Sequence, residues 1–127
     1  MQNLVDFVEK CDMWAEPYVD ILNVAPQTSI DDAYRVQVAM MKRCVERGDR
    51  IVGYKAAGTT RKAQNLLGDQ PYPILGTLLR SQLIDDGGTY EMREGRTYVE
   101  AEVGVLLRRD LSGPGVTYLD ALAAVDC

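Results

Sequence analysis

The stretch SIDDAYRVQVAMMKRCVERGDRIVGYK, residues 29–55, predicts an amphipathic helix followed directly by a β-strand. Ser29 and Asp32 have the spacing of a capping box, in which each side chain satisfies a backbone amide of the other residue. Apolar side chains then recur at helical spacing until Gly48 supplies a C-terminal stop. We therefore expect a helix at about residues 30–47.

Further elements follow on both sides of this stretch. Upstream, a first helical segment is expected before the loop around Pro26. Downstream, the β-branched residues of 51–55 predict a short strand, and a helix is expected at about 61–67. Residues 98–107 alternate apolar and other side chains, which predicts the clearest strand of the chain.

The last element expected is a helix that begins near Thr117, which forms a capping pair with Asp120. No glycine, basic last turn or polar tail marks its end before Cys127. Helices followed by strands in this order indicate an α+β fold.

Composition narrows the class of protein. The 127 residues carry a net charge of −5 and no basic run longer than two residues, so we expect neither a nucleic-acid nor a membrane partner. No apolar stretch approaches the ~20 residues that a membrane-spanning helix needs. Acidic residues within Met1–Trp14 argue against a signal peptide, so the expected location is the cytoplasm.

Cysteine and histidine usage limits the chemistry further. Cys11, Cys44 and Cys127 lack metal-ligand spacing, and their odd number argues against a disulfide framework, so we expect reduced thiols. The chain has no histidine. Acid–base or metal chemistry would therefore rest on carboxylates, lysine and tyrosine, and any metal would be a hard, oxygen-ligated cation.

Two carboxylates stand out on the predicted strand 98–107. Glu100 and Glu102 would lie on the same face, roughly 6 to 7 Å apart at the backbone. A divalent cation such as Mg²⁺ or Mn²⁺ would relieve their repulsion. The pair is also compatible with the solvent-exposed face of a half-exposed strand, and spacing alone favours that interpretation.

Three other polar residues have a functional and a structural interpretation. Lys55, at the end of the first strand, could stabilise a developing enolate or be a solvated strand-end lysine. Gln37 could face a pocket or bond to backbone at the edge of the core. Thr60, with Thr59 before it, could bind a ligand or cap the next helix.

Several motifs, taken together and in order, resemble the 2-keto-4-pentenoate hydratase and 4-oxalocrotonate decarboxylase family of the fumarylacetoacetase-like group. The resemblance covers residue 30 to the end. It is carried by these segments: Ala33-Tyr34-Arg35-Val36-Gln37, Ile51-Val52-Gly53-Tyr54-Lys55, Gly68-Asp69-Gln70-Pro71, Gly76-Thr77-Leu78-Leu79, Val99-Glu100-Ala101-Glu102 and Arg109-Asp110-Leu111.

The resemblance implies a role for each candidate residue. Glu100 and Glu102 would be metal ligands, Lys55 an active-site lysine, and Gln37 and Thr60 substrate-binding residues. In the family a third glutamate follows the helix that starts here near Thr117, beyond the end of this chain.

The resemblance also implies a fold, N-terminal helices followed by a partial mixed β-sheet of the fumarylacetoacetase-like kind, and a domain organisation. Residues 1–50 would form an N-terminal helical region, and residues 51–127 the first part of a β-rich catalytic domain. Family members are considerably longer, so the chain is expected to be a fragment. Where relatives often carry an acidic residue after the Gln-Pro pair, this sequence has Tyr72-Pro73-Ile74.

The function implied is a hydro-lyase that adds water to a small 2-hydroxydienoate in the breakdown of aromatic compounds. A divalent metal, Mg²⁺ or Mn²⁺, would assist, and a homo-oligomer is expected. Decarboxylation of a vinylogous keto acid needs the same enolate, so a 4-oxalocrotonate-type decarboxylase is an alternative. A non-catalytic or truncated partner subunit of such an enzyme is the alternative from another class.

Overall fold

The computed structural model describes residues 2–11, 20–66, 72–92 and 97–126. The chain divides into two compact units, Met1–Arg96 and Thr97–Cys127. None of the helices in the described ranges combines the length and apolar character that crossing a membrane requires. The division expected at residue 50, between a helical region and a β-rich domain, stays a prediction.

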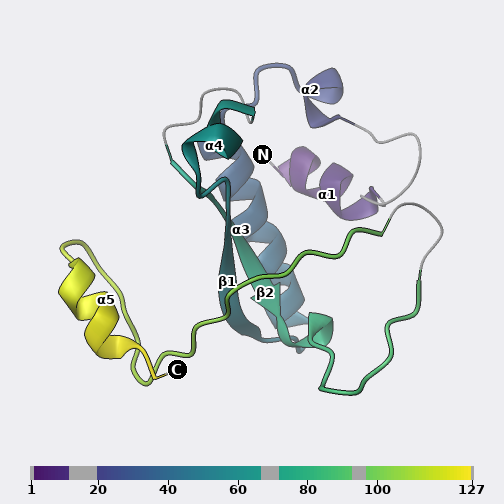
Figure 1. Ribbon diagram of the computed structural model, residues 1–127. Coiled ribbons are helices and arrows are strands. Elements are labelled where there is room, and N and C mark those ends of the chain that lie inside the picture. Colours follow the sequence, from purple (N-terminus) through teal and green to yellow (C-terminus); the bar gives the residue numbers. More distant parts are fainter. Residues whose placement is uncertain (1, 12–19, 67–71, 93–96, 127) are drawn as a thin grey trace. The chain divides into compact units, whose positions relative to one another are not determined.

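Three helices open the first unit: α1 (Gln2–Lys10), α2 (Ile21–Val24) and α3 (Ile30–Glu46) (Figure 1). The capping box predicted at α3 is confirmed, because the Asp32 amide donates to the Ser29 hydroxyl at 3.1 Å and the Ser29 amide donates to the Asp32 carboxylate at 3.2 Å. The helix gives way to Arg47 and then to Gly48 in the left-handed region. Its predicted length is therefore correct to within one residue.

Ion pairs join α1 to α3. The Arg43 guanidinium contacts Asp6 at 2.5 Å and also pairs with Glu9, and Arg47 reaches Glu9 at 2.5 Å. Hydrogen bonds from Arg47 and Arg43 hold the pKa of Glu9 below its usual range, so the carboxylate stays ionised. Val5, the residue before Asp6 in α1, is buried.

The sheet described in this unit is an antiparallel pair, β1 (Ile51–Ala57) and β2 (Ile74–Leu79), with α4 (Arg61–Leu66) in the connection. The strand predicted at 51–55 is confirmed and continues two residues further. A bulge lies between Ile51 and Gly53. Residue 67, the expected end of this helix, lies outside the described residues.

A side-chain staple closes the end of the hairpin, where β2 runs into the 3₁₀ turn Arg80–Gln82. The Asp49 carboxylate accepts from the Arg50 amide at 2.7 Å, and from the Ser81 amide at 3.2 Å and hydroxyl at 2.5 Å. These donors, led by the Ser81 hydroxyl, lower the pKa of Asp49.

The second unit contains α5 (Tyr118–Ala124), which begins with the predicted Thr117–Asp120 capping box. The expectation of a helix without a stop is wrong. Val125 adopts an extended conformation and forms an antiparallel bridge with Leu107, and the Asp126 amide donates to the Leu106 carbonyl at 2.7 Å. Backbone pairing ends this helix in place of a glycine.

The strand predicted over residues 98–107 is also wrong for the structure described. Residues 98–106 have no regular structure, and Leu107 alone forms a bridge. Val99 and Val103 are 94 % and 93 % exposed. Alternation specifies which side chains would share a face, but a strand also needs a neighbour for its backbone amides and carbonyls, and the described part of this unit supplies a single bridge.

Candidate functional site

Lys55 lies inside β1, not at its end, directly opposite Gly76 of β2. Its aliphatic stem crosses the backbone of Gly76. A Cβ atom placed on Gly76 would lie 3.2 Å from Lys55 Cγ and 3.8 Å from Lys55 Cδ. The pairing of β1 with β2 therefore brings Lys55 together with a glycine from a distant part of the chain.

Gln37 reaches from α3 to the backbone of β2. Its Nε2 donates to the Leu75 carbonyl at 3.2 Å, and its Oε1 accepts from the Thr77 hydroxyl at 3.4 Å. From the preceding turn of α3, the Tyr34 hydroxyl accepts from the Leu75 amide at 3.0 Å. Two side chains thus satisfy both backbone groups of Leu75, as a neighbouring strand would.

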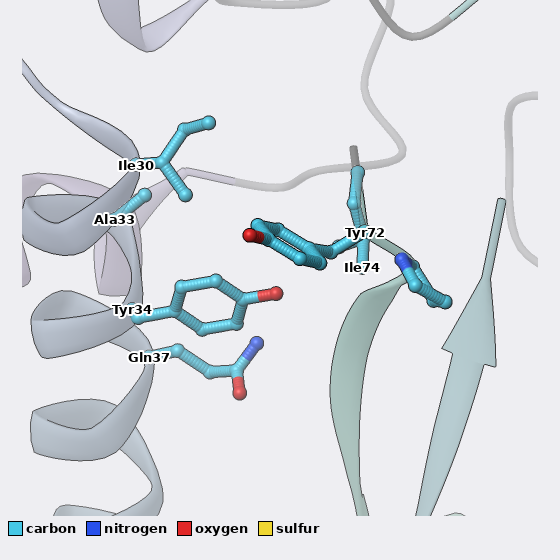
Figure 2. Close-up of a pocket in the computed structure, with 7 residues that line it drawn as sticks. Ile30, Ala33, Tyr34, Gln37, Tyr72 and Ile74 are labelled. Carbon is cyan, nitrogen blue, oxygen red and sulfur yellow. The ribbon is translucent and has the colours of Figure 1, made fainter. Parts of the chain in front are cut away.

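A pocket of about 360 Å³ lies beside this contact, between α3 and the start of β2. Figure 2 shows Tyr34 and Gln37 extending from the helix toward Tyr72, which comes from the opposite wall. The lining is mainly apolar, with two phenol hydroxyls and one amide as polar groups. It consists of Ile30, Ala33, Tyr34, Gln37, Tyr72, Pro73 and Ile74.

Both interpretations of Gln37 therefore apply: it lines a pocket, and it is bonded to backbone. Helical periodicity places Tyr34 in the apolar stripe of α3 and does not by itself predict its role in the pocket wall. A usable signal exists, because residues three positions apart on a helix share a face, and Tyr34 stands three positions before Gln37.

Thr60 occupies the N-terminus of α4. Its hydroxyl accepts from the Ala63 amide at 3.2 Å, which is the bond of a helix cap. The structural interpretation of Thr60 is confirmed by this bond. A substrate-binding role for Thr60 stays a prediction.

Glu100 and Glu102 lie in the second unit, in the exposed stretch before Leu107. Their carboxylate oxygens are the donor type that Mg²⁺ and Mn²⁺ prefer. Within the ranges that the structure describes, no group of three or more His, Cys, Asp or Glu side chains could hold a metal ion. The donor chemistry of the two carboxylates fits a divalent cation, and their role as metal ligands stays a prediction.

Cysteine chemistry plays no visible part in these arrangements. Cys11 and Cys44 are free thiols, as predicted, and each is partly buried. Cys127 lies outside the described residues.

Comparison with known proteins gives consistent relatives, although no family model matches the chain. A 2-hydroxypent-2,4-dienoate hydratase from Pseudomonas putida is 35% identical over 101 residues, which cover 78% of this chain and 45% of that protein. A 4-oxalocrotonate decarboxylase from Pseudomonas putida is 32% identical over 124 residues, 97% of this chain and 47% of that protein.

A solved structure matches the fold as well. A 4-oxalocrotonate decarboxylase from Pseudomonas putida G7, complexed with calcium and acetate, superposes with a TM-score of 0.79 at 28% identity, over 98% of this chain and 48% of that one. The chain spans about half the length of these relatives. Over most of its length, this chain matches the family of the 2-keto-4-pentenoate hydratases and 4-oxalocrotonate decarboxylases in both sequence and fold.

Proposed function

We propose that this chain forms part of a cytoplasmic hydratase that adds water to a small 2-hydroxydienoate produced during the breakdown of aromatic compounds. The observation that carries the proposal is the 35% identity to a 2-hydroxypent-2,4-dienoate hydratase over 78% of this chain. The match covers 45% of that hydratase, so the activity is proposed for an enzyme that also contains the part outside the match.

Lys55 is the proposed catalytic residue. Its ammonium group stabilises the negative charge that develops on the 2-oxygen when the dienol becomes the keto tautomer. The proton goes to the terminal carbon of the diene, and water then adds across the remaining conjugated double bond. A cation carried by a paired strand suits this role, because the hydrogen-bonded backbone of β1 and β2 fixes the position from which the long Lys55 side chain extends.

Glu100 and Glu102 are the proposed metal-binding residues. They would supply two carboxylates to Mg²⁺ or Mn²⁺, whose charge would help to offset that of the substrate's carboxylate and 2-oxygen. Because two carboxylates leave most of an octahedral site to other ligands, this chain alone is expected to bind Mn²⁺ weakly. Calorimetric titration measures this, and tight binding that survives Glu100→Gln and Glu102→Gln together would contradict the assignment.

Gln37 and Thr60 are proposed as substrate-binding residues. For Gln37 the support is its place in the wall of the pocket between α3 and β2. Its bonds to Leu75 and Thr77 mean that a Gln37 variant should change stability as well as KM. For Thr60 the support is the family resemblance.

A decarboxylase is the second candidate, because the structural match to a 4-oxalocrotonate decarboxylase covers 98% of this chain. Both reactions pass through an enolate that Lys55 could stabilise. A non-catalytic partner subunit is the third possibility, favoured by the absence of a three-carboxylate cluster from the described residues. We also propose a homo-oligomeric assembly, on the family resemblance alone.

A chimera tests the proposal. This sequence is joined to the part of the Pseudomonas putida hydratase beyond the match, and each substrate is offered separately: a 2-hydroxydienoate, followed by its loss of ultraviolet absorbance, and a vinylogous keto acid, followed by carbon dioxide release. Turnover of the first supports a hydratase. Turnover of the second alone replaces it with a decarboxylase, and a folded chimera inactive toward both favours the partner subunit.

Lys55→Met in an active chimera should lower kcat by about 10²-fold or more while KM changes little, because the stabilised charge exists in the transition state. Lys62→Met, on α4, is the matched control and should leave kcat unchanged. An unchanged kcat with a raised KM in Lys55→Met would make Lys55 a substrate-carboxylate binder.

A further inference from the structure

The position opposite Lys55 is unusual for a strand interior. Glycine weakens strands, because it has no side chain to pack and loses more backbone entropy than other residues on folding. Gly76 nevertheless lies in the middle of β2, paired with Lys55. A glycine at this place needs a physical reason.

Backbone conformation is not that reason. The glycines with positive φ among the described residues are Gly48, Gly58, Gly87, Gly113 and Gly115. Gly76 is absent from this group, so an alanine could adopt its backbone angles without strain.

Space is the reason that the structure offers. A Cβ on Gly76 would meet Lys55 Cγ at 3.2 Å, closer than ordinary van der Waals contact. The bare glycine therefore lets the lysine stem lie flat across β2. On the same hairpin Gly53 makes a useful contrast, because a Cβ there would meet Leu78 Cδ1 at an ordinary 3.8 Å and nothing of Lys55.

We propose that Gly76 is a positioning residue for Lys55: it forms a flat seat for the aliphatic stem and thereby directs the ammonium group. The role in the reaction rests on the proposed function of Lys55. Lysine has a long, flexible side chain, so a seat that restricts its first bonds reduces the directions open to its charge.

A double-mutant cycle on the full chain tests the seat without reference to activity. Wild type, Gly76→Ala, Lys55→Ala and the double variant are unfolded in urea and followed by circular dichroism. Gly76→Ala should lower the folding equilibrium constant in the presence of Lys55 and lower it less, or raise it, in the Lys55→Ala background. The two effects should differ roughly threefold or more, as expected for residues in contact.

Gly53→Ala is the control cycle and should have the same effect in both backgrounds. If Gly76→Ala prevents folding, recovery of folding in the Lys55→Ala background supports the seat. Equal effects of Gly76→Ala in both backgrounds, or failure of the double variant to refold, would overturn it.

The positioning role has its own readout in the chimera described above. A methyl group at residue 76 should lower kcat by about tenfold with KM nearly unchanged, because small displacements of a catalytic group are costly. Gly53→Ala should leave both constants unchanged. If Gly76 and Lys55 are coupled in the double-mutant cycle but Gly76→Ala leaves kcat unchanged, the positioning role is overturned and the proposed hydratase function is not affected. An inactive wild-type chimera would overturn the proposed function and the positioning role with it, while the cycle still decides the seat.

Discussion

At the scale of single residues, a few side chains form hydrogen bonds with backbone groups that have no partner in a neighbouring strand. Tyr34 and Gln37 satisfy the amide and the carbonyl of Leu75 at the edge of β2, and Asp49 gathers the amides at the end of the hairpin. These contacts matter because a strand with one neighbour leaves half of its backbone groups without a ladder partner.

Tyr34→Phe should release the Leu75 amide. The substitution keeps the ring in the pocket wall and removes one acceptor, at an expected cost of about 1 kcal/mol. Hydrogen exchange of the Leu75 amide should accelerate, while exchange of the amides bonded between β1 and β2 should change little. Tyr54→Phe, at an exposed ring of β1, is the control, and equal acceleration in both variants would contradict the assignment.

The Asp49–Ser81 staple predicts a pH dependence. The folded pKa of Asp49 lies below the ordinary value of 3.8, so its contribution to stability is present above that value and is lost as pH falls through the folded pKa. Ser81→Ala removes the largest cause of the shift and should move the Asp49 pKa back toward 3.8.

Carboxyl ¹³C titration by NMR measures this pKa. The pKa of Asp120, lowered mainly by the Thr117 hydroxyl, should not change in Ser81→Ala. An unchanged Asp49 pKa in Ser81→Ala would show that the Arg50 and Ser81 backbone amides sustain the shift without the hydroxyl.

At the scale of elements, helices with reciprocal caps formed where the sequence predicted them, and strands formed where a partner was available. The starts of α3 and α5 follow from capping boxes that involve residues three positions apart, and α3 ends before Gly48. β1 forms because β2 pairs with it, whereas residues 98–106 carry an equally regular pattern and remain irregular. Local patterns therefore suffice for a helix end and fall short for a strand.

Ser29→Ala should destabilise the first unit by about 1 kcal/mol, because the substitution removes the cap of the longest helix. The midpoint of urea denaturation is the measurement. Ser29→Asn restores an acceptor for the Asp32 amide and should recover most of the loss. If Asn is as harmful as Ala, the hydroxyl contributes through some contact other than the cap.

At the scale of the whole molecule, apolar side chains are poorly covered. In the second unit Val99, Val103, Tyr118 and Leu119 are between 72% and 94% exposed. Buried side chains are few among the described residues, which limits the hydrophobic stabilisation available to each unit. Exposed apolar surface of this kind promotes association.

The isolated 127-residue polypeptide is therefore expected to self-associate. Light scattering after size-exclusion chromatography should show a mass that rises with concentration, and Leu119→Gln on α5 should reduce the effect. Val38→Gln is the control and should not reduce the self-association. Val38 on α3 is exposed to a similar degree but lies between the charged residues Arg35 and Lys42. A compact monomer with strong amide protection across residues 98–107 would contradict the prediction.

The sequence by itself determined α3, the start of α5, the caps of both, the position of β1 and the family resemblance, because capping, periodicity and motif order are set by residues close together in the chain. It did not predict α2, which begins just before a stretch expected to be a loop. It also named Lys55, Gln37, Thr60, Glu100 and Glu102 as candidates. The tertiary structure alone decided that Lys55 lies on Gly76, that Tyr34 and Gln37 hold Leu75, and that residues 98–106 form no strand. The first two are contacts between residues far apart in the chain. The stretch 98–106 forms no strand because a strand needs a neighbouring strand to complete its backbone hydrogen bonds, and a local sequence pattern does not supply that neighbour.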